Sequence, residues 1–329
     1  MRIIHDLVQL DKSLKQSVVT IGNFDGVHLA HQKLLRKVVA TARPLGATAI
    51  AVTFDPHPVK LLAPEHAPRL LTPLARKAKL IEALGIDTLV VLPFTRELAH
   101  LSPVVFVRKI LVGDLRVRSV HVGPNFRFGY RQSGDVEILA ELARQDGFRL
   151  DVLPTLVVRS ERVSSTRIRE LLSTGRVSLA ARLLGRPFSV FGPIVAGLGV
   201  GRKHTVPTLN LAPVEEQLPK IGVYVTRTRL GDAWHESVTN VGHKPTFGDH
   251  RLTVETFLLG FSSEVADTEM EIEFLYRLRE EMKFQNPAIL KVQIQEDARR
   301  SLKFFRLLRS LHQQRSSPLT PFLSPKAKR

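Results

Sequence analysis

The sequence predicts an α/β protein of two domains: a doubly wound parallel sheet towards the N-terminus and an antiparallel β-barrel with a long helix towards the C-terminus. Its 329 residues are enough for two domains of roughly 150 residues each. Between residues 18 and 174, short β-branched runs alternate with amphipathic helical stretches, as in a parallel sheet covered by helices. Beyond them, strand-like runs are separated by Gly, Asp and Pro turns. We therefore expect domains at 1–185 and 186–313, followed by a disordered basic tail at 314–329.

The composition is that of an ordinary globular protein. Hydrophobic residues make up 43% of the chain, which excludes wholesale disorder, collagen-like repetition and coiled coil. The absence of cysteine excludes disulfides, thiolate metal sites and cysteine nucleophiles. No run approaches the ~18 apolar residues of a membrane span, and acidic residues interrupt the N-terminal stretch before a signal peptide is complete. We therefore expect a cytoplasmic protein without a membrane partner.

Five β-branched runs predict the strands of the first sheet. They are VVTIG (18–22), TAIAVTF (48–54), DTLVVLP (87–93), VRSVHVG (117–123) and FRLDVLP (148–154). Apolar residues at helical spacing predict helices at HLAHQKLLRKVVATA (28–42), DVEILAELARQ (135–145) and IRELLSTG (168–175). Sheets of this kind bind ligands at the carboxyl ends of their strands.

The second domain is predicted from strands of a different pattern. The strand candidates are FSVFGPIVAG, GVYVTRTRLGDAWHESVTNVG, TVETFLLGF and MEIEFLYRLR, separated by turn residues. They indicate a small antiparallel barrel. A long helix should follow from about Pro287 to His312 and pack against the barrel. Its expected apolar stripe consists of Ile289, Leu290, Val292, Ile294, Leu302, Phe305 and Leu308.

The segment TIGNFDGVHLAHQ (20–32) runs from a strand through a glycine-bearing turn directly into a helix. Free N–H groups at a helix start and the positive end of its dipole favour an anion. Gly22 and Gly26 allow backbone and ligand to approach closely. His28 and His31 lie three residues apart, so both should face one side of the first helical turn. The segment therefore predicts a phosphate-binding site with two histidines.

This segment also carries a family resemblance. GNFDGVHLAHQ resembles the nucleotidyltransferase signature GxFDxxHxGH and, in the form GxFDGVHxGHQ, the signature of bacterial FAD synthetases. TFDPHP (53–58), GPNFRFG (123–129) and RVSSTRIRELLSTGRV (162–177) are similar to further motifs of that family, in the expected order. One departure is Ala30, which stands where the family usually has glycine. Alanine adds only a methyl group, so we expect the site to survive.

The resemblance implies adenylyl transfer from ATP to the phosphate of FMN, with release of pyrophosphate. The attacking phosphate is already largely dianionic at pH 7, because its second pKa is about 6, so no general base is required. His28, His31 and arginine side chains would align and neutralise the phosphates together with Mg²⁺. The residues implied in binding nucleotide or flavin are Gly22, Phe24, Asp25, Gly26, Asn125, Arg162, Ser165, Thr166 and Arg169. Two alternatives stay open: an ordinary capped helix at VSSTRIR, and a turn asparagine at Asn125.

The barrel segment resembles the riboflavin kinase domain that bacterial FAD synthetases carry at their C-terminal end. The similar motifs are GPIVAGLGVGR (192–202), VPTLNL (206–211), PKIGVY (219–224), TNVGHKPTFGD (239–249), TVETFLLGF (253–261) and FLYRLREEMKF (274–284). The alcohol of riboflavin stays protonated at pH 7, so a base is useful. Glu255 is the candidate, since strand alternation places it with Phe257 and Leu259, a setting that would raise its pKa. An exposed strand glutamate is the alternative.

Further residues of the second site follow from the same resemblance. Thr208 and Asn210 match the family segment PTAN, which holds Mg²⁺ with ATP. Arg279 would help to hold flavin or phosphate, with a charged surface position as the alternative. The chain reads GRKHTVPTLN where the family tends to read GRxLGFPTAN, so four positions differ. They are His204, Thr205, Val206 and Leu209.

Three functions remain in consideration. The leading one is a two-site enzyme that uses ATP to convert riboflavin to FMN and then FMN to FAD. The second is an enzyme in which only one of these activities is retained. The third is a basic nucleic-acid-binding protein on the same fold, suggested by the net charge of +17. The sequence carries no bZIP, C2H2 or RRM-type signature, so we expect no nucleic-acid partner. The oligomeric state stays open.

Overall fold

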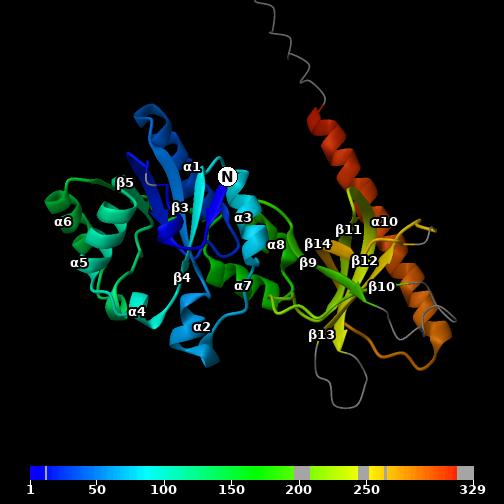
Figure 1. Ribbon diagram of the computed structural model, residues 1–329. Helices are drawn as coiled ribbons and strands as arrows, with labels where there is room; N and C mark the ends of the chain where they lie inside the picture. Colours follow the sequence, from blue (N-terminus) through cyan, green and yellow to red (C-terminus); the bar gives the residue numbers. More distant parts are fainter. Residues whose placement is uncertain (12, 196–207, 244–251, 263–264, 317–329) are drawn as a thin grey trace, which may run out of the picture. The chain divides into compact units, whose positions relative to one another are not determined.

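The computed structural model describes residues 1–11, 13–195, 208–243, 252–262 and 265–316, and the chain forms two compact units (Figure 1). The first unit contains Met1–Thr174, Leu179–Pro187 and Glu215–Leu218, and the second contains the other described residues. Both predicted architectures are confirmed. The domain limits given above stay predictions, because compactness does not define where a domain begins.

A parallel sheet of six strands forms the centre of the first unit. Its strand order is β1-β4-β3-β2-β5-β6. The bounds are β1 (Arg2–Ile4), β2 (Ser17–Ile21), β3 (Thr48–Asp55), β4 (Thr88–Pro93), β5 (Val117–Val122) and β6 (Arg149–Val152). The five predicted strands are confirmed, and β1 was not predicted because three residues are too short for a pattern. The chain order reverses between β2 and β5, which is the point where such sheets bind ligands.

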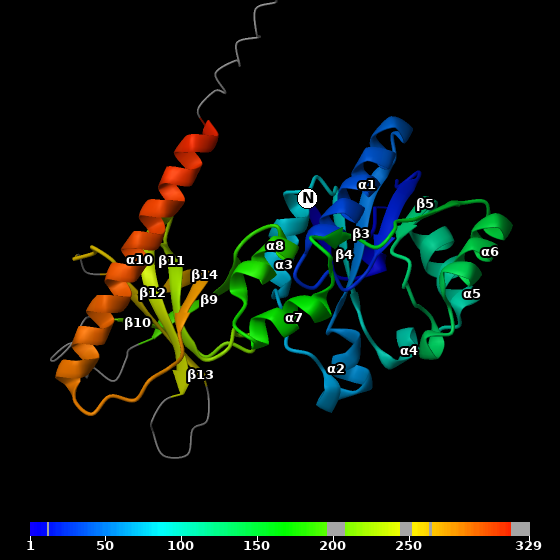
Figure 2. The same cartoon turned by 180° about the vertical axis from the view of Figure 1, so that it is seen from behind.

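Helices cover both faces of this sheet (Figure 2). Alternate residues of β2 and β3 enter two separate apolar clusters, with Val19 and Ile50 in one and Val18 and Ala49 in the other. The helices are α1 (Leu29–Leu45), α2 (Pro58–Leu62), α3 (Leu74–Glu82), α4 (Arg96–Ala99), α5 (Pro103–Val105), a wide helical segment (Phe106–Asp114), α6 (Val136–Asp146), α7 (Ser165–Ser173) and α8 (Val177–Leu184). A small hairpin consists of β7 (Val157–Val158) and β8 (Glu161–Arg162).

The second unit is a closed barrel in the order β10-β13-β12-β11-β14-β9. Its elements are β9 (Phe188–Val195), β10 (Leu209–Leu211), β11 (Gly222–Leu230), β12 (Ala233–His243), β13 (Leu252–Leu258), β14 (Glu269–Arg279) and the helix α10 (Pro287–Ser316). The short strand β10 was predicted only as part of a motif. All pairings between these strands are antiparallel, as predicted.

Hydroxyl groups fill part of the barrel interior. Thr226 Oγ1 lies 2.8 Å from Ser237 Oγ and 2.7 Å from Thr239 Oγ1. Thr239 continues the network to Thr256 at 2.9 Å, and all four residues are fully buried. Each of these four hydroxyls therefore has a partner, as burial of polar groups requires.

The outer face of β12 carries Trp234, the only tryptophan of the chain. The guanidinium carbons of Arg227 and Arg229 lie 5.2 and 5.8 Å from the centroid of its ring. These are cation–π distances, so both β11 arginines pack against the tryptophan.

The long helix α10 packs on the barrel as predicted, and its predicted apolar stripe is buried only in part: Phe305 is buried, Leu290, Ile294 and Leu308 are half-buried, and the other three residues are exposed. The buried face contains Asp297, Ser301 and Phe305, which follow each other at intervals of four residues. Of the predicted stripe, Val292 is 66% exposed and Ile289 is also exposed. Polar residues occupy the buried face because the charge of Asp297 is compensated by Arg279, whose Nη2 lies 2.7 Å from Asp297 Oδ2.

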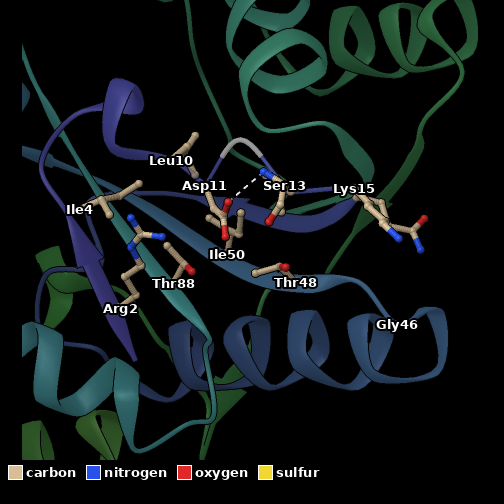
Figure 3. A pocket seen from close by; sticks show the side chains of 12 residues that line it. Arg2, Ile4, Leu10, Asp11, Ser13, Lys15, Gly46, Thr48, Ile50 and Thr88 are labelled. Atoms are coloured by element: carbon tan, nitrogen blue, oxygen red, sulfur yellow. Dashed lines mark hydrogen bonds between the residues drawn. The ribbon is translucent and has the colours of Figure 1, made fainter.

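A pocket of about 380 Å³ opens at the amino ends of the parallel strands (Figure 3). Arg2, Thr48 and Thr88, which begin β1, β3 and β4, lie in its lining. Because the strands are parallel, this is the edge opposite to the predicted nucleotide site. Among the described residues, no helix is both long and apolar enough to cross a membrane.

Candidate functional site

The loop between β2 and α1 is the centre of the first candidate site. β2 ends at Ile21, and the N–H of Gly22 donates to the carbonyl oxygen of Val52 at 3.0 Å. Three residues of the loop have left-handed backbones: Phe24 (φ 46°), Gly26 (φ 83°) and Val27 (φ 40°). Positive φ is uncommon for aromatic and β-branched residues, so this loop is strained and closely folded.

His28 and His31 are brought together at the start of α1. Their rings stack at a centroid distance of 3.6 Å, and the ring of Phe24 meets His31 edge-on at 5.2 Å. His28 is the N-cap of α1, and its Nδ1 accepts a hydrogen bond from the N–H of His31 at 3.3 Å. In a neutral ring whose Nδ1 accepts, the proton lies on Nε2. The Nε2–H of His28 is therefore a hydrogen-bond donor.

Burial keeps both imidazoles neutral at pH 7. His28 is only 4% exposed, and burial lowers its pKa to about 4, with a smaller contribution from the charge of Arg186. The pKa of His31 is also well below its ordinary value, first because of burial and then because of the charges of His28 and Lys77. Among the described residues, Nδ1 of His31 has no hydrogen-bond partner.

Asp25 connects this loop to α7. Its carboxylate is almost fully buried and accepts hydrogen bonds from the N–H groups of Leu71 (2.9 Å) and Thr72 (3.1 Å). It also forms an ion pair with Arg169 of α7. The hydroxyl of Ser165 donates to the carbonyl oxygen of Asp25 at 2.9 Å. Of the predicted site residues, Asp25, Ser165 and Arg169 therefore lie together with the histidine loop.

The remaining predicted residues of this site lie on the surface. Asn125 is in the exposed turn after β5, which neighbours β2 in the sheet. Arg162 is exposed on β8, and Thr166 is exposed in the first turn of α7. Ala30, the departure from the signature, is half-buried in the first turn of α1, which begins normally at Leu29.

Lys77 is a member of this site that the sequence did not reveal. It is only 5% exposed, and its Nζ lies 3.5 Å from Thr53 Oγ1. Burial lowers its pKa, while the carboxylates of Asp25 and Asp55 act in the opposite direction. A lysine in the stretch LARKAKLIE is expected to be exposed to solvent on its helix. Lys77, however, precedes the buried Ala78 and lies four residues before the buried Ile81, so it shares their face of the helix. That spacing was the available signal.

The second candidate site is a row of side chains across three strands of the barrel. Glu255 of β13 is directly opposite Asn210 of β10 and Asn240 of β12. Directly opposed residues share a face of a sheet, so these three side chains form one row. Thr256, the neighbour of Glu255, belongs to the interior hydroxyl network, so Glu255 is on the outer face, where it is half-buried. Its predicted raised pKa stays a prediction.

Other predicted residues of the second site have different surroundings. Thr208 is half-buried just before β10, and Asn210 is nearly fully buried. Arg279 ends β14 and forms two further contacts from Nε to the carboxylate of Asp297, at 3.0 and 3.1 Å. The departures at His204, Thr205 and Val206 lie outside the described residues, as does much of TNVGHKPTFGD.

Comparisons with known proteins match two successive parts of the chain to two different families. The FAD synthetase family matches residues 10–167, and the riboflavin kinase family matches residues 184–305. A bifunctional riboflavin kinase/FMN adenylyltransferase from Pseudomonas fluorescens is 36% identical and aligns over 90% of this chain and 96% of its own length. The enzyme of that name from Haemophilus influenzae is 33% identical, over 93% of this chain and 99% of its own length.

A solved structure is similar in fold over most of this chain. It is described as a macrolide-efflux protein from Streptococcus pneumoniae, with a TM-score of 0.81 and 25% identity over 90% of this chain and 96% of that one. Its description differs from the names of the curated relatives, whose sequence identities are higher. The matches to both families and the identity over nearly the full length together show that the chain belongs to the family of bifunctional riboflavin kinases/FMN adenylyltransferases.

Proposed function

We propose that this protein makes FAD from riboflavin in two ATP-dependent steps at two separate sites. In the barrel, the terminal phosphoryl group of ATP is transferred to the riboflavin alcohol, giving FMN and ADP. At the histidine loop, the FMN phosphate attacks the α-phosphate of a second ATP, giving FAD and pyrophosphate. The observation that carries this proposal is one chain that joins a matched FAD synthetase unit to a matched riboflavin kinase unit.

The neutral histidines suit the adenylyl transfer. A phosphate that is already ionised needs no base, and a histidine with a pKa of about 4 would be a weak one. The Nε2–H of His28 instead donates to a phosphate oxygen, which stabilises charge as the α-phosphate is attacked. We assign the departing pyrophosphate to the start of α7, where the backbone N–H of Ser165, the hydroxyl of Thr166 and the nearby arginines Arg162 and Arg169 supply donors.

The row across the barrel suits phosphorylation of an alcohol. Glu255 accepts the proton of the riboflavin hydroxyl as that oxygen attacks. Thr208 and Asn210 offer uncharged oxygen atoms, a donor set that fits Mg²⁺ shared with ATP phosphates and water. Among the described residues, no cluster of three His, Asp or Glu side chains is placed to hold a metal by itself. Bound Mg²⁺ would neutralise phosphate charge there. We assign Arg279, at the end of β14, to holding the flavin or its phosphate.

Polyphosphate substrates account for the basic charge without a nucleic acid. We therefore propose riboflavin, FMN, FAD and ATP as the partners, and the cytoplasm as the location, in keeping with the absence of cysteine. The two alternatives are the retention of one activity and a nucleic-acid-binding role.

Flavin separation after incubation with riboflavin, ATP and Mg²⁺ tests the proposal. FMN should appear first, followed by FAD with an equal amount of pyrophosphate. FMN alone would show that the adenylating site is inactive, and FAD formed only from added FMN would show that the barrel is inactive. Nucleic-acid binding with a steep salt dependence and no flavin product would contradict the proposal. Chelation of the metal should stop both steps, and added Mg²⁺ should restore them.

A further inference from the structure

Arg186 contacts the histidine loop from a distant part of the chain. Its Nη2 donates to the carbonyl oxygen of Gly26 at 2.8 Å, and its Nη1 donates to that of Val27 at 3.3 Å. Arg186 follows α8 and precedes Pro187, at the point where the chain leaves the first unit. A residue at the predicted domain boundary therefore holds the backbone of the first site.

The surrounding contacts fix the same segment. The side-chain amide of Gln32 donates to Val27 O at 2.9 Å and to Leu184 O at 2.8 Å. Gly185 has φ 75°, and a Cβ atom there would approach Leu29 Cδ2 to 2.6 Å. The residues on either side of Arg186 are thus closely packed against the first turn of α1, which limits the positions open to the guanidinium.

The strained backbone of the loop needs stabilising contacts from residues outside the loop. Phe24 and Val27 both have left-handed backbones, each of which costs on the order of 1–3 kcal/mol. Because the peptide group is planar, a fixed carbonyl oxygen of Val27 also fixes the orientation of the N–H of His28. The position of His28 at the N-cap of α1 therefore depends on the carbonyl that Arg186 and Gln32 share.

We propose that Arg186 is a positioning residue for adenylyl transfer: its guanidinium fork holds the carbonyl oxygens of Gly26 and Val27, and thereby the imidazole of His28. The proposal rests on the role assigned above to His28. The fork is essential to it, because a lysine would keep the charge near His28 but present a single point of contact.

The test uses the full-length variants Arg186→Lys and Arg186→Met, with the exposed Arg182→Met as matched control and His28→Ala for comparison. We expect kcat for FMN adenylation to fall about 10- to 100-fold in both Arg186 variants, with little change in KM, since misplacement of a reacting group costs up to about 100-fold. Riboflavin phosphorylation should be unchanged. Titration of His28 by NMR should give a pKa near 4 in Arg186→Lys and a higher pKa in Arg186→Met, where the neighbouring charge is lost.

The outcomes separate the two levels of the proposal. Wild-type adenylation by Arg186→Met, or full activity of Arg186→Lys, would overturn the positioning role while leaving the proposed function intact. Unchanged adenylation by His28→Ala would overturn the role of His28 itself. An equal loss of riboflavin phosphorylation would show general damage to the fold and would also overturn the proposal, as would an equal loss in Arg182→Met.

Discussion

At the scale of single residues, the central groups that we propose for the two sites differ in chemical type. His28 is buried and neutral, and we assign its Nε2–H to donating a hydrogen bond, with no proton transferred. Glu255 is a half-buried carboxylate opposite two asparagines on neighbouring strands. This difference suits the two proposed nucleophiles, since a phosphate is ionised before it reacts and an alcohol must lose its proton during the reaction.

Substitution of these residues should separate the two activities. His28→Ala should lower FMN adenylation about 100-fold, the usual effect of removing one donor to developing charge, and leave riboflavin phosphorylation intact. Glu255→Gln should do the reverse, by about 100-fold or more, because it removes the base. Product analysis with riboflavin or FMN as the starting flavin measures each step. A parallel loss of both steps in either variant would contradict separate sites.

His28 should also make the first unit sensitive to acid. Its pKa is about 4 when folded and 6.5 when exposed, so between these values only the unfolded chain binds the proton. Stability is therefore lost as the pH falls, by about 2 kcal/mol at pH 5. Urea titrations followed by circular dichroism should show His28→Gln losing about 2 kcal/mol less than the wild type between pH 7 and pH 5. The exposed His66→Gln is the control, and equal losses in wild type and His28→Gln would refute the assignment.

The first site was predictable where a sequence motif contains its residues, which includes Ser165 and Arg169 of the distant motif at 162–177. His28 and His31 follow from adjacent positions in one strand–loop–helix segment. Lys77 and Arg186 reach the same loop from α3 and from the end of α8, and no spacing in the sequence relates them to it. Such contacts depend on tertiary packing, which a one-dimensional pattern does not contain.

At the scale of elements, long regular runs were predictable and short ones were not. The β-branched runs of β2 to β6 specify strands, whereas β1 and β10 have three residues each. The apolar pattern of α10 identified only part of its buried face, for another reason. Its buried face includes Asp297, and apolarity alone cannot predict a buried carboxylate whose partner lies on another element.

The pair between Arg279 and Asp297 should be essential to the packing of α10 on the barrel. Asp297 is 2% exposed and receives three close contacts from the guanidinium of Arg279. Asp297→Asn would leave the charge of the half-buried Arg279 without its carboxylate, at a cost of about 3–5 kcal/mol. Urea titration at pH 7 measures it, with the exposed Asp232→Asn as control. A loss below about 1 kcal/mol would show that solvent reaches Arg279.

At the scale of the whole molecule, the two units have different folds, different cores and separate candidate sites. The sequence predicted this division because the pattern changes from β-branched runs alternating with helices to strands joined by short turns. It did not predict that residues 215–218, between two barrel strands, pack with the first unit, where the N–H of Gln217 donates to Leu70 O at 2.9 Å. The chain thus returns to the first unit after the barrel strands β9 and β10.

Because Trp234 is the only indole and belongs to the barrel, fluorescence excited selectively in the indole reports on one half alone. His28→Gln at pH 5 should therefore move the unfolding curve recorded by circular dichroism and leave the curve recorded by emission in place. Coincident shifts of both curves would mean that the halves melt as one. If only the circular-dichroism curve shifts, the two signals from a single sample, without any added dye, follow the unfolding of one half while the other half stays folded.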